Sequence, residues 1–304
     1  MVGTSPLPRG RGPSEAGHVS AAAMAARLAP GEPAAPPDPL TIRQWLWGPG
    51  FHIPGTAEDV LALAGPFAAN AATRLLDVAA GLGGAARAIA ARSGAYVSAL
   101  ERNSDLARRG RALSIAAGRH KQVPVGHMDP ETLELRAGAF DGIFGREASH
   151  LVRDKERFMR VLILGLRPRG QLLLTEFVAE PALAGRPELA AWAALQPRGP
   201  SLWTLRQYSD CFLNLGVELR VPEDISAAYK SQIVEGWVRL LRTVDLRSLP
   251  RDHRLAVVAE AERWMPTVAA LDSGALRMYR FHVLAGPVRG GLSAAKDGAV
   301  APRH

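Results

Sequence analysis

Short apolar runs alternate with amphipathic segments through the middle of the chain. The apolar runs predict strands at Leu75–Val78, Tyr96–Leu100, Val123–Gly126, Phe140–Phe144 and Gln171–Phe177. Apolar residues recur at helical spacing between and after these runs, and predict helices at Gly83–Arg92, Asp105–Ala117, Lys155–Leu166 and Leu205–Leu215. This alternation is typical of an α/β fold, here a doubly wound, Rossmann-like and mainly parallel sheet.

Later segments complete the predicted architecture. Val217–Val221 and Arg280–Leu284 would bring the sheet to seven strands and fit an antiparallel pair at one edge. We expect residues 40–70 to form an N-terminal lid, and residues 185–200 and 226–270 to form a helical cap. The sequence therefore predicts one domain over residues 39–289.

The two ends of the chain differ from this domain in composition. Residues 1–38 and 290–304 are rich in Pro, Gly, Ala and Ser. Such segments cannot bury enough apolar surface to offset the entropy lost on ordering. We therefore expect both to be disordered tails.

Charge and composition narrow the functional class. The net charge of +8 and pI of about 10.3 would suit a nucleic-acid partner, but the basic residues are scattered and almost all arginine, so none is expected. Cys211 is the single cysteine, which excludes an internal disulfide and a cysteine–zinc cluster, and no metal site is predicted. No apolar run reaches the roughly 20 residues of a membrane span. The N-terminus lacks the apolar core of a signal peptide, so we expect a cytoplasmic protein.

The stretch LLDVAAGLGG, Leu75 to Gly84, joins the first predicted strand to a helix. Asp77 closes the strand, and Gly81 and Gly83 let the backbone pass close to a ligand. Glu101 ends the next strand, where a carboxylate can accept both hydroxyls of a ribose. An acid ahead of the turn would repel the pyrophosphate of a nicotinamide cofactor, but it can accept hydrogen bonds from an ammonium group. We therefore expect S-adenosylmethionine (SAM), which joins an adenosine ribose to an amino acid.

Five motifs in order resemble those of the class I SAM-dependent methyltransferases: LLDVAAGLGG, SALER, GHMDPETL, FDGIFGREASH and LRPRGQLLLTEF. The resemblance covers most of the chain, from about Trp47 to Leu284. It implies a methyltransferase in which Asp129 faces the adenine amino group. The cofactor-binding residues that we expect are Asp77, Ala79 (where a glycine is usual), Gly81, Gly83, Glu101, Arg102, Asp129 and Arg146.

Within this class the chain resembles the methyltransferase type 11 group, and other stretches are most similar to the phosphoethanolamine N-methyltransferases. WGPGFHIPGT, Trp47–Thr56, is similar to their segment that closes over SAM and the phosphobase, and LWTLRQYSDCF and VPEDISAAY are similar to later segments. The resemblance implies that Trp47 and Phe51 belong to a lid. Phe51 stands where that family has a tyrosine implicated, with a histidine, in deprotonating the amine. Phe177 stands where it has a phosphate-binding tyrosine.

His150 is the candidate general base, because the ordinary pKa of histidine, about 6.5, suits proton abstraction near neutrality. His52, in the lid, is its rival, and Arg198, in the cap, is a candidate for facing an anionic substrate. Structural roles are the alternatives: a purely structural histidine at position 150, a simple Asp-Pro turn at Asp129, and an ion pair between Arg146 and its neighbour.

We expect methyl transfer from SAM to a small-molecule acceptor, an amine of phosphoethanolamine type. An alternative is methylation at carbon or oxygen of a lipid-like or secondary metabolite, which the apolar Phe51 and Phe177 favour. Another is a non-catalytic SAM-binding protein, of which Ala79 and Phe51 would be the traces. The number of methyl groups and the oligomeric state are left open.

Overall fold

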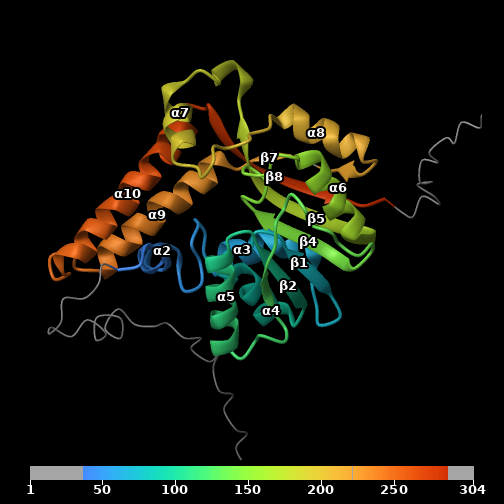
Figure 1. The fold of residues 1–304 in the computed structure, drawn as a ribbon, viewed down its shortest axis with the longest axis horizontal. Helices are drawn as coiled ribbons and strands as arrows, with labels where there is room; N and C mark the ends of the chain where they lie inside the picture. The colour runs from blue at the N-terminus through green and yellow to red at the C-terminus, as the bar shows by residue number, and fades with distance from the viewer. Residues whose placement is uncertain (1–36, 221, 287–304) are drawn as a thin grey trace, which may run out of the picture.

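The computed structural model describes residues 37–220 and 222–286. Its sheet follows the order β3-β2-β1-β4-β5-β8-β6, and a short strand, β7, also pairs with β8 (Figure 1). The strands are β1 (Arg74–Asp77), β2 (Tyr96–Glu101), β3 (Val125–His127), β4 (Phe140–Arg146), β5 (Leu166–Ala179), β6 (Glu218–Leu219), β7 (Glu223–Asp224) and β8 (Leu276–Leu284). Strands β3, β2, β1, β4 and β5 are parallel, and β8 is antiparallel to β5 and β6. The predicted seven-stranded, mainly parallel sheet is confirmed.

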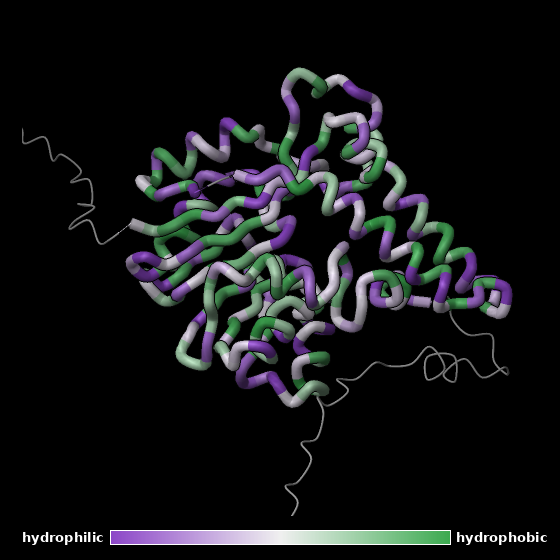
Figure 2. The backbone as a smooth tube through the Cα atoms, turned by 180° about the vertical axis from the view of Figure 1, so that it is seen from behind, coloured by the Kyte–Doolittle hydropathy of each residue, from purple (hydrophilic) through white to green (hydrophobic). Residues whose placement is uncertain are grey.

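Helices pack on both faces of the sheet and bury two separate cores. One core contains Leu75, Phe144 and Leu173 together with residues of α3 (Ala57–Ala64) and α4 (Gly84–Ser93). The other contains Leu76, Ile143 and Leu174 together with residues of α6 (Lys155–Gly165) and α8 (Leu205–Asn214). Adjacent residues of one strand thus point to opposite faces, as a doubly wound sheet requires. In Figure 2, apolar segments gather along the central strands.

Helices α2 (Pro39–Trp47), α9 (Ser226–Thr243) and α10 (Arg251–Asp272) project beside the sheet (Figure 1). Trp47 of α2 is buried, and its ring meets the Trp264 ring of α10 edge to face at 5.4 Å. A Cβ atom on Gly236 of α9 would lie 2.1 Å from Cζ3 of Trp47, so glycine is what lets the two helices approach this closely. Along α9 and α10, hydrophilic and hydrophobic residues alternate (Figure 2).

The remaining elements are α5 (Ser104–Ala116), α7 (Pro187–Ala194) and two 3₁₀ turns, Gly65–Phe67 and Pro181–Leu183. None of the helices in the two described ranges has the length and apolarity of a membrane span.

Several boundaries differ from the predicted ones. Strand β5 begins five residues before the predicted Gln171, at Leu166, because its first part continues the pairing of Phe140 with Leu166 beyond a bulge. Strand β8 begins at Leu276, since it pairs with β5 over nine residues. The predicted strand at 217–221 is reduced to Glu218–Leu219, and Val221 lies outside the described residues. Within the expected lid, α3 packs on α4. The two predicted disordered tails fall almost entirely outside the described residues.

Candidate active site

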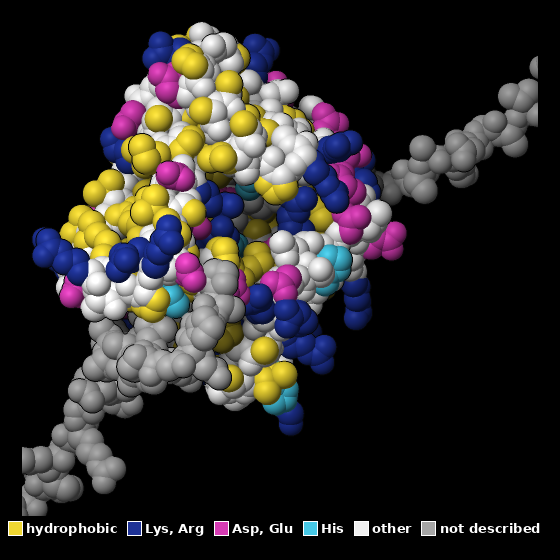
Figure 3. Space-filling model, turned by 60° about the vertical axis from the view of Figure 1, so that its left-hand side comes forward, with side chains coloured by type: hydrophobic (Ala, Val, Ile, Leu, Met, Phe, Trp, Pro, Cys, Tyr) yellow, Lys and Arg dark blue, Asp and Glu magenta, His cyan; other side chains and the backbone are white. Residues whose placement is uncertain are grey.

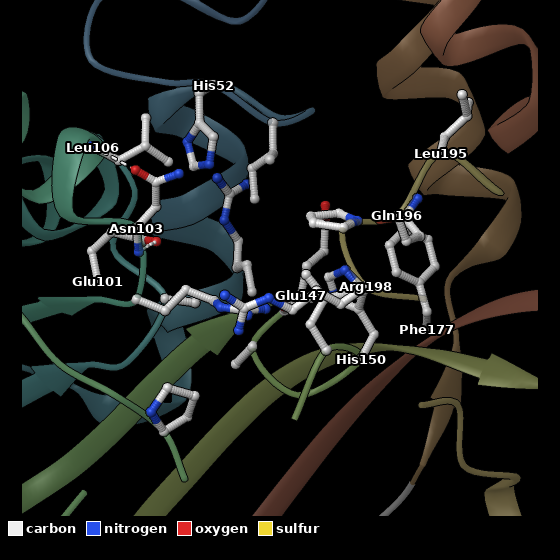
Figure 4. Close-up of a pocket in the computed structure, with 18 of the residues that line it drawn as sticks. His52, Glu101, Asn103, Leu106, Glu147, His150, Phe177, Leu195, Gln196 and Arg198 are labelled. Atoms are coloured by element: carbon white, nitrogen blue, oxygen red, sulfur yellow. Dashed lines mark hydrogen bonds between the residues drawn. The ribbon is translucent and has the colours of Figure 1, made fainter. Parts of the chain in front are cut away.

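A cavity of about 860 Å³ opens beyond the carboxyl ends of the parallel strands, between the sheet and the helices α2, α7 and α10. Figure 3 shows this hollow with basic side chains around its mouth. In the close-up, His52, Glu101 and Asn103 lie on one side, and His150, Phe177 and Gln196 lie on the other (Figure 4). We call the first side the cofactor end; its lining includes Ala79, Glu101, Arg102, Asn103 and Asp129. We call the second side the acceptor end; its lining includes Arg43, His150, Phe177, Trp192 and Arg263.

Glu101 organises the cofactor end. It ends β2, it is only 5% exposed, and its Oε2 accepts the Gly81 N–H at 2.8 Å while its Oε1 accepts the Asn103 N–H at 2.7 Å. Burial raises the pKa of this carboxyl. One carboxylate thus fixes both the glycine loop and the start of α5, and it keeps further lone pairs for a ligand in the cavity.

Asp77 has an unmet hydrogen-bonding capacity. Its Oδ1 accepts the Ala79 N–H at 3.3 Å, but its buried Oδ2 has no partner among the described residues. Burial raises the pKa of Asp77 to about 7, against the opposing effect of Arg146. A buried carboxylate without a partner is costly, so this oxygen is suited to receive a cationic group of a ligand.

The segment between α2 and α3, residues 48–56, folds down over the glycine loop. The Gly84 N–H donates to the Gly50 carbonyl at 3.1 Å, which ties this segment to the start of α4. The His52 ring lies where a Cβ atom of Gly81 would be, 1.9 Å from Cε1, and Gly81 has a φ of +54°. Burial, with help from Arg43, Arg146 and Arg263, lowers the pKa of His52 to about 3. His52 is therefore neutral and acts as a packing residue against the loop in this conformation.

Arg146 links the end of β4 to the same segment. Its Nη1 donates to the Pro54 carbonyl at 2.9 Å, and its guanidinium lies over the Phe51 ring, 5.9 Å from the centroid. The side chain lines the cavity and is in electrostatic range of Asp77 and Glu147. It joins the two ends of the cavity.

His150 lies at the acceptor end and is 8% exposed. Its Nδ1 is 3.0 Å from the Glu147 carbonyl oxygen, which can only accept, so Nδ1 carries the proton and Nε2 keeps its lone pair. Burial lowers the pKa of His150 to about 4, with smaller contributions from Arg102 and Lys155. The imidazole is therefore neutral at physiological pH.

Glu147 stands between the two ends, in a left-handed backbone conformation with a φ of +55°. Its N–H donates to the Thr175 carbonyl at 2.7 Å, which holds the strained residue at the end of β4. The Tyr229 hydroxyl of α9 donates to its Oε1 at 2.5 Å, and burial raises the pKa of Glu147. The strained backbone turns a carboxylate toward the cavity.

Aromatic rings form the wall behind His150. The Phe177 ring packs edge to face with the rings of His150 at 5.4 Å, Trp192 at 5.1 Å and Tyr229 at 5.7 Å. The wall excludes water from the histidine and can contact either an apolar group or, through its π faces, a cation.

Arginines form the opposite wall. Arg43 Nε donates to Glu260 at 2.8 Å, and the same Glu260 oxygen accepts the Trp264 Nε1–H at 2.9 Å. Arg263 also lines the cavity, and no carboxylate lies within 4 Å of it among the described residues. This wall is suited to an anion.

The structure places the other expected residues as follows. Arg102, Asp129 and Arg198 line the cavity, although Asp129 also accepts the Glu131 N–H at 3.0 Å, as the turn alternative requires. Phe51 borders a small adjoining cavity beside Asp77, whereas Trp47 does not line the main cavity, because it is buried between α9 and α10. Arg146 and Glu147 both line the cavity.

Sequence reasoning missed Arg43, Arg263, Trp192 and Tyr229. The first three lie in helices and outside the quoted motifs, so no local pattern marks them. Tyr229 could have been found, because it is the last residue of the quoted VPEDISAAY stretch, and its phenol donates to Glu147 of the cavity lining.

A family model described as "Methyltransferase domain" matches residues 52–220, which is more than half of the chain. The chain belongs to this methyltransferase family. SAM is the methyl donor of this domain.

Curated relatives of the methyltransferase differ in their acceptors. It is 31% identical over 122 residues to a glycine/sarcosine/dimethylglycine N-methyltransferase of Actinopolyspora halophila, covering 40% of this chain and 22% of that protein. It is 26% identical over 140 residues to phosphoethanolamine N-methyltransferase 2 of Caenorhabditis elegans, covering 44% and 31%. The chain thus spans less than a third of the length of either relative.

Solved structures show the same fold with different substrates. Phosphoethanolamine N-methyltransferase 2 of Haemonchus contortus, in complex with SAM, superposes with a TM-score of 0.71 at 19% identity, covering 82% of this chain and 57% of that one. Geranyl diphosphate C-methyltransferase of Streptomyces coelicolor superposes with a TM-score of 0.57 at 16% identity, covering 75% and 79%. The fold therefore accommodates both N- and C-methylation.

The carboxylate oxygens near the cofactor end fit the polar groups of SAM. Asp77 lines the small adjoining cavity, and its Oδ2, which has no partner among the described residues, suits the ammonium group. Glu101 lines the main cavity, and its remaining lone pairs suit the ribose hydroxyls. When bound, SAM supplies a methyl group already activated on sulfonium.

Proposed function

We propose that the methyltransferase methylates the nitrogen of a small amine that also carries an anionic group, as phosphoethanolamine does. The observation that carries the proposal is the pairing, in one cavity, of a neutral histidine beside a carboxylate and of two arginines opposite them. The histidine and carboxylate suit the amine, and Arg43 and Arg263 suit the anion. An acceptor with both groups would bridge the two walls.

The proposed chemistry follows from the state of His150. An amine attacks the methyl group only through its lone pair, so an ammonium must first lose a proton. The lone pair on Nε2 of His150 receives this proton, because Nδ1–H is fixed on the Glu147 carbonyl. The burial and the arginine field that keep His52 and His150 neutral also favour the neutral amine. Positioning this amine in line with the methyl group supplies most of the rate.

Four acceptors with methyl-labelled SAM test the proposal. Phosphoethanolamine carries amine and phosphate, glycine carries amine and carboxylate, ethanolamine carries only the amine, and geranyl diphosphate carries only the anion. We expect label on phosphoethanolamine or glycine and at least tenfold less on ethanolamine, since a charge-assisted hydrogen bond contributes roughly 1.5–3 kcal/mol. Labelling of ethanolamine at an equal rate would show that Arg43 and Arg263 do not bind an anionic group of the acceptor.

A second candidate is methylation of an apolar acceptor at carbon or oxygen. It is favoured by Phe177, Trp192 and Leu195, which make one side of the acceptor end apolar. Label on geranyl diphosphate, or only on an apolar compound in an extract of the source cells, would select this candidate over the amine.

A further inference from the structure

The loop that carries His150 is held from the face of the sheet opposite the cavity. Phe177 and Glu176 are neighbours on β5, so their side chains point to opposite faces. Phe177 lines the cavity, while Glu176 is 0% exposed on the α8 side. A fully buried carboxylate outside the cavity calls for an explanation, because burying a charge is costly unless it is well hydrogen-bonded.

Glu176 is bonded to the backbone of the residue before His150. The Ser149 N–H lies 3.1 Å from Oε1 and 3.0 Å from Oε2 of Glu176. The Ser149 hydroxyl lies 2.7 Å from the Tyr208 hydroxyl of α8. Ser149 is thus fixed through its backbone by β5 and through its side chain by α8.

A third contact ties the loop to the chain that leads into α8. The Lys155 ammonium donates to the Val152 carbonyl at 2.7 Å and to the Ser201 carbonyl, and the Ser201 N–H donates to the His150 carbonyl at 2.7 Å. The LWTLRQYSDCF stretch, residues 202–212, follows directly and supplies Trp203, whose ring lies 5.8 Å from the Lys155 nitrogen, and Tyr208. The LWTLRQYSDCF stretch does not line the cavity. Its contacts with the loop that carries His150 give it a structural role.

We propose that Glu176 is a positioning residue for His150: through the Ser149 N–H it fixes the loop so that Nδ1–H stays on the Glu147 carbonyl and Nε2 faces the cavity. Tyr208 supports the same position through the Ser149 hydroxyl. The inference rests on the proposed role of His150 in proton transfer.

The charges around the two groups are consistent with this arrangement. Glu176 faces three titratable groups: Lys155 of α6, Tyr208 of α8, and Glu147, which follows β4. Burial raises the pKa of Glu176 to about 7, and the Ser149 hydrogen bonds and the Lys155 charge oppose that rise. His150 faces Arg102, Lys155 and the Gln196 side chain, and its interactions with the Glu147 carbonyl and with Gln196 oppose the lowering of its pKa.

The test measures the His150 imidazole itself in the full-length protein with S-adenosylhomocysteine. Proteins labelled with ¹⁵N-histidine give the tautomer and pKa by two-bond proton–nitrogen correlation, and the His150→Gln variant assigns the signal. In Glu176→Leu we expect the Nδ1–H tautomer to lose its dominance, the pKa of His150 to rise from about 4 towards 6.5, and kcat to fall about tenfold to a hundredfold. The affinity for S-adenosylhomocysteine should change less than about twofold.

Further variants separate positioning from stability. Glu176→Gln keeps one acceptor for the Ser149 N–H and should recover most of the wild-type tautomer. Tyr208→Phe removes the bond to the Ser149 hydroxyl, and Ser149→Ala removes that bond together with the hydroxyl's interaction with Glu176, so the double variant should match Ser149→Ala. Phe212→Leu, in the same buried layer of α8, should lower the melting temperature without moving the His150 signal.

An unchanged His150 signal in Glu176→Leu, or an equal change in Phe212→Leu, would overturn the inference. Failure of the proposed function would look different. If His150→Gln retained full turnover, His150 would not be the base, yet the imidazole signal would still report whether Glu176 holds it.

Discussion

The cofactor end and the acceptor end of the cavity differ in how far apart along the chain their residues lie. Apart from His52, the chain between Asp77 and Asp129 supplies all that we assign to the cofactor end, at the tips of three adjacent strands. The acceptor end draws on Arg43 of α2, His150 after β4, Trp192 of α7 and Arg263 of α10. Hydrogen bonds of the sheet fix the positions of the cofactor-end residues, whereas the packing of helices fixes most of the acceptor-end residues. Changes at the two ends should therefore separate cofactor binding from turnover.

The largest separation is expected from His150→Gln. Loss of a general base lowers kcat by about 10²- to 10⁴-fold, while the affinity for S-adenosylhomocysteine stays within about twofold, because His150 lies at the acceptor end. Single-turnover rates and calorimetry measure the two quantities. His120→Gln, at an exposed histidine, is the matched control. Equal losses in both measurements would mean that the ends are not separable.

Glu101→Ala is the reciprocal change. It removes the acceptor of the Gly81 and Asn103 N–H groups, so we expect SAM affinity to fall roughly tenfold to a hundredfold. Calorimetric titration measures this, with Glu134→Gln, at an exposed acid, as the control. Unchanged affinity would contradict the assignment of Glu101 to the cofactor.

The pH dependence of SAM binding sharpens the role of Asp77. In the free protein the pKa of Asp77 is raised to about 7, so the carboxyl is mostly protonated below that pH. An ammonium ligand favours the carboxylate, so binding below pH 7 must release this proton. We expect affinity to rise by up to about tenfold per pH unit between pH 5 and 7 and then to level off. Calorimetry in buffers of different ionisation enthalpy counts the proton, and Asp77→Asn should give weak, pH-independent binding. If SAM affinity in the wild type did not change with pH, Asp77 would not be the group that binds the SAM ammonium.

Arg263→Met and Arg43→Met each remove one positive charge from the arginine wall, and Arg43→Met also removes the partner of Glu260. For whichever anionic amine is methylated we expect KM to rise about fivefold to tenfold, less than for a buried pair, since Arg263 is partly exposed and water screens its charge. Steady-state kinetics with ethanolamine, which has no anionic group, provide the control. An equal rise in KM for both acceptors would show that the arginines shape the cavity without binding the anion.

Gly236→Ala is expected to have the smallest effect on chemistry. The added Cβ would lie 2.1 Å from Trp47, so α2 must shift on α9, and overpacking of this kind costs about 1–3 kcal/mol. The melting temperature should fall by a few degrees, and acceptor KM should change more than SAM affinity because α2 carries Arg43. Gly185→Ala, where nothing lies within 4 Å of the new Cβ, is the matched control.

The sequence by itself determined which segments form the central strands and which residues provide the chemistry of the cofactor end. Alternating apolar runs predict β1, β2, β4 and β5 because a strand buried on both faces must be apolar throughout. Asp77, the glycine turn and Glu101 are recognisable because each sits at the end of such a strand, where the parallel arrangement brings them together.

Only the tertiary structure decided the acceptor end. Nothing in the local pattern distinguishes Arg43 and Arg263 from the other arginines of this arginine-rich chain; they meet because α2 and α10 pack on one another. Trp47 was assigned to the lid by resemblance, yet its ring is buried between α9 and α10. His150 was a candidate from its place after β4, but its neutral state and its tautomer come from burial and from the Glu147 carbonyl. Strand ends are fixed by a periodic backbone, whereas convergence of distant helices depends on side-chain packing that no short stretch encodes.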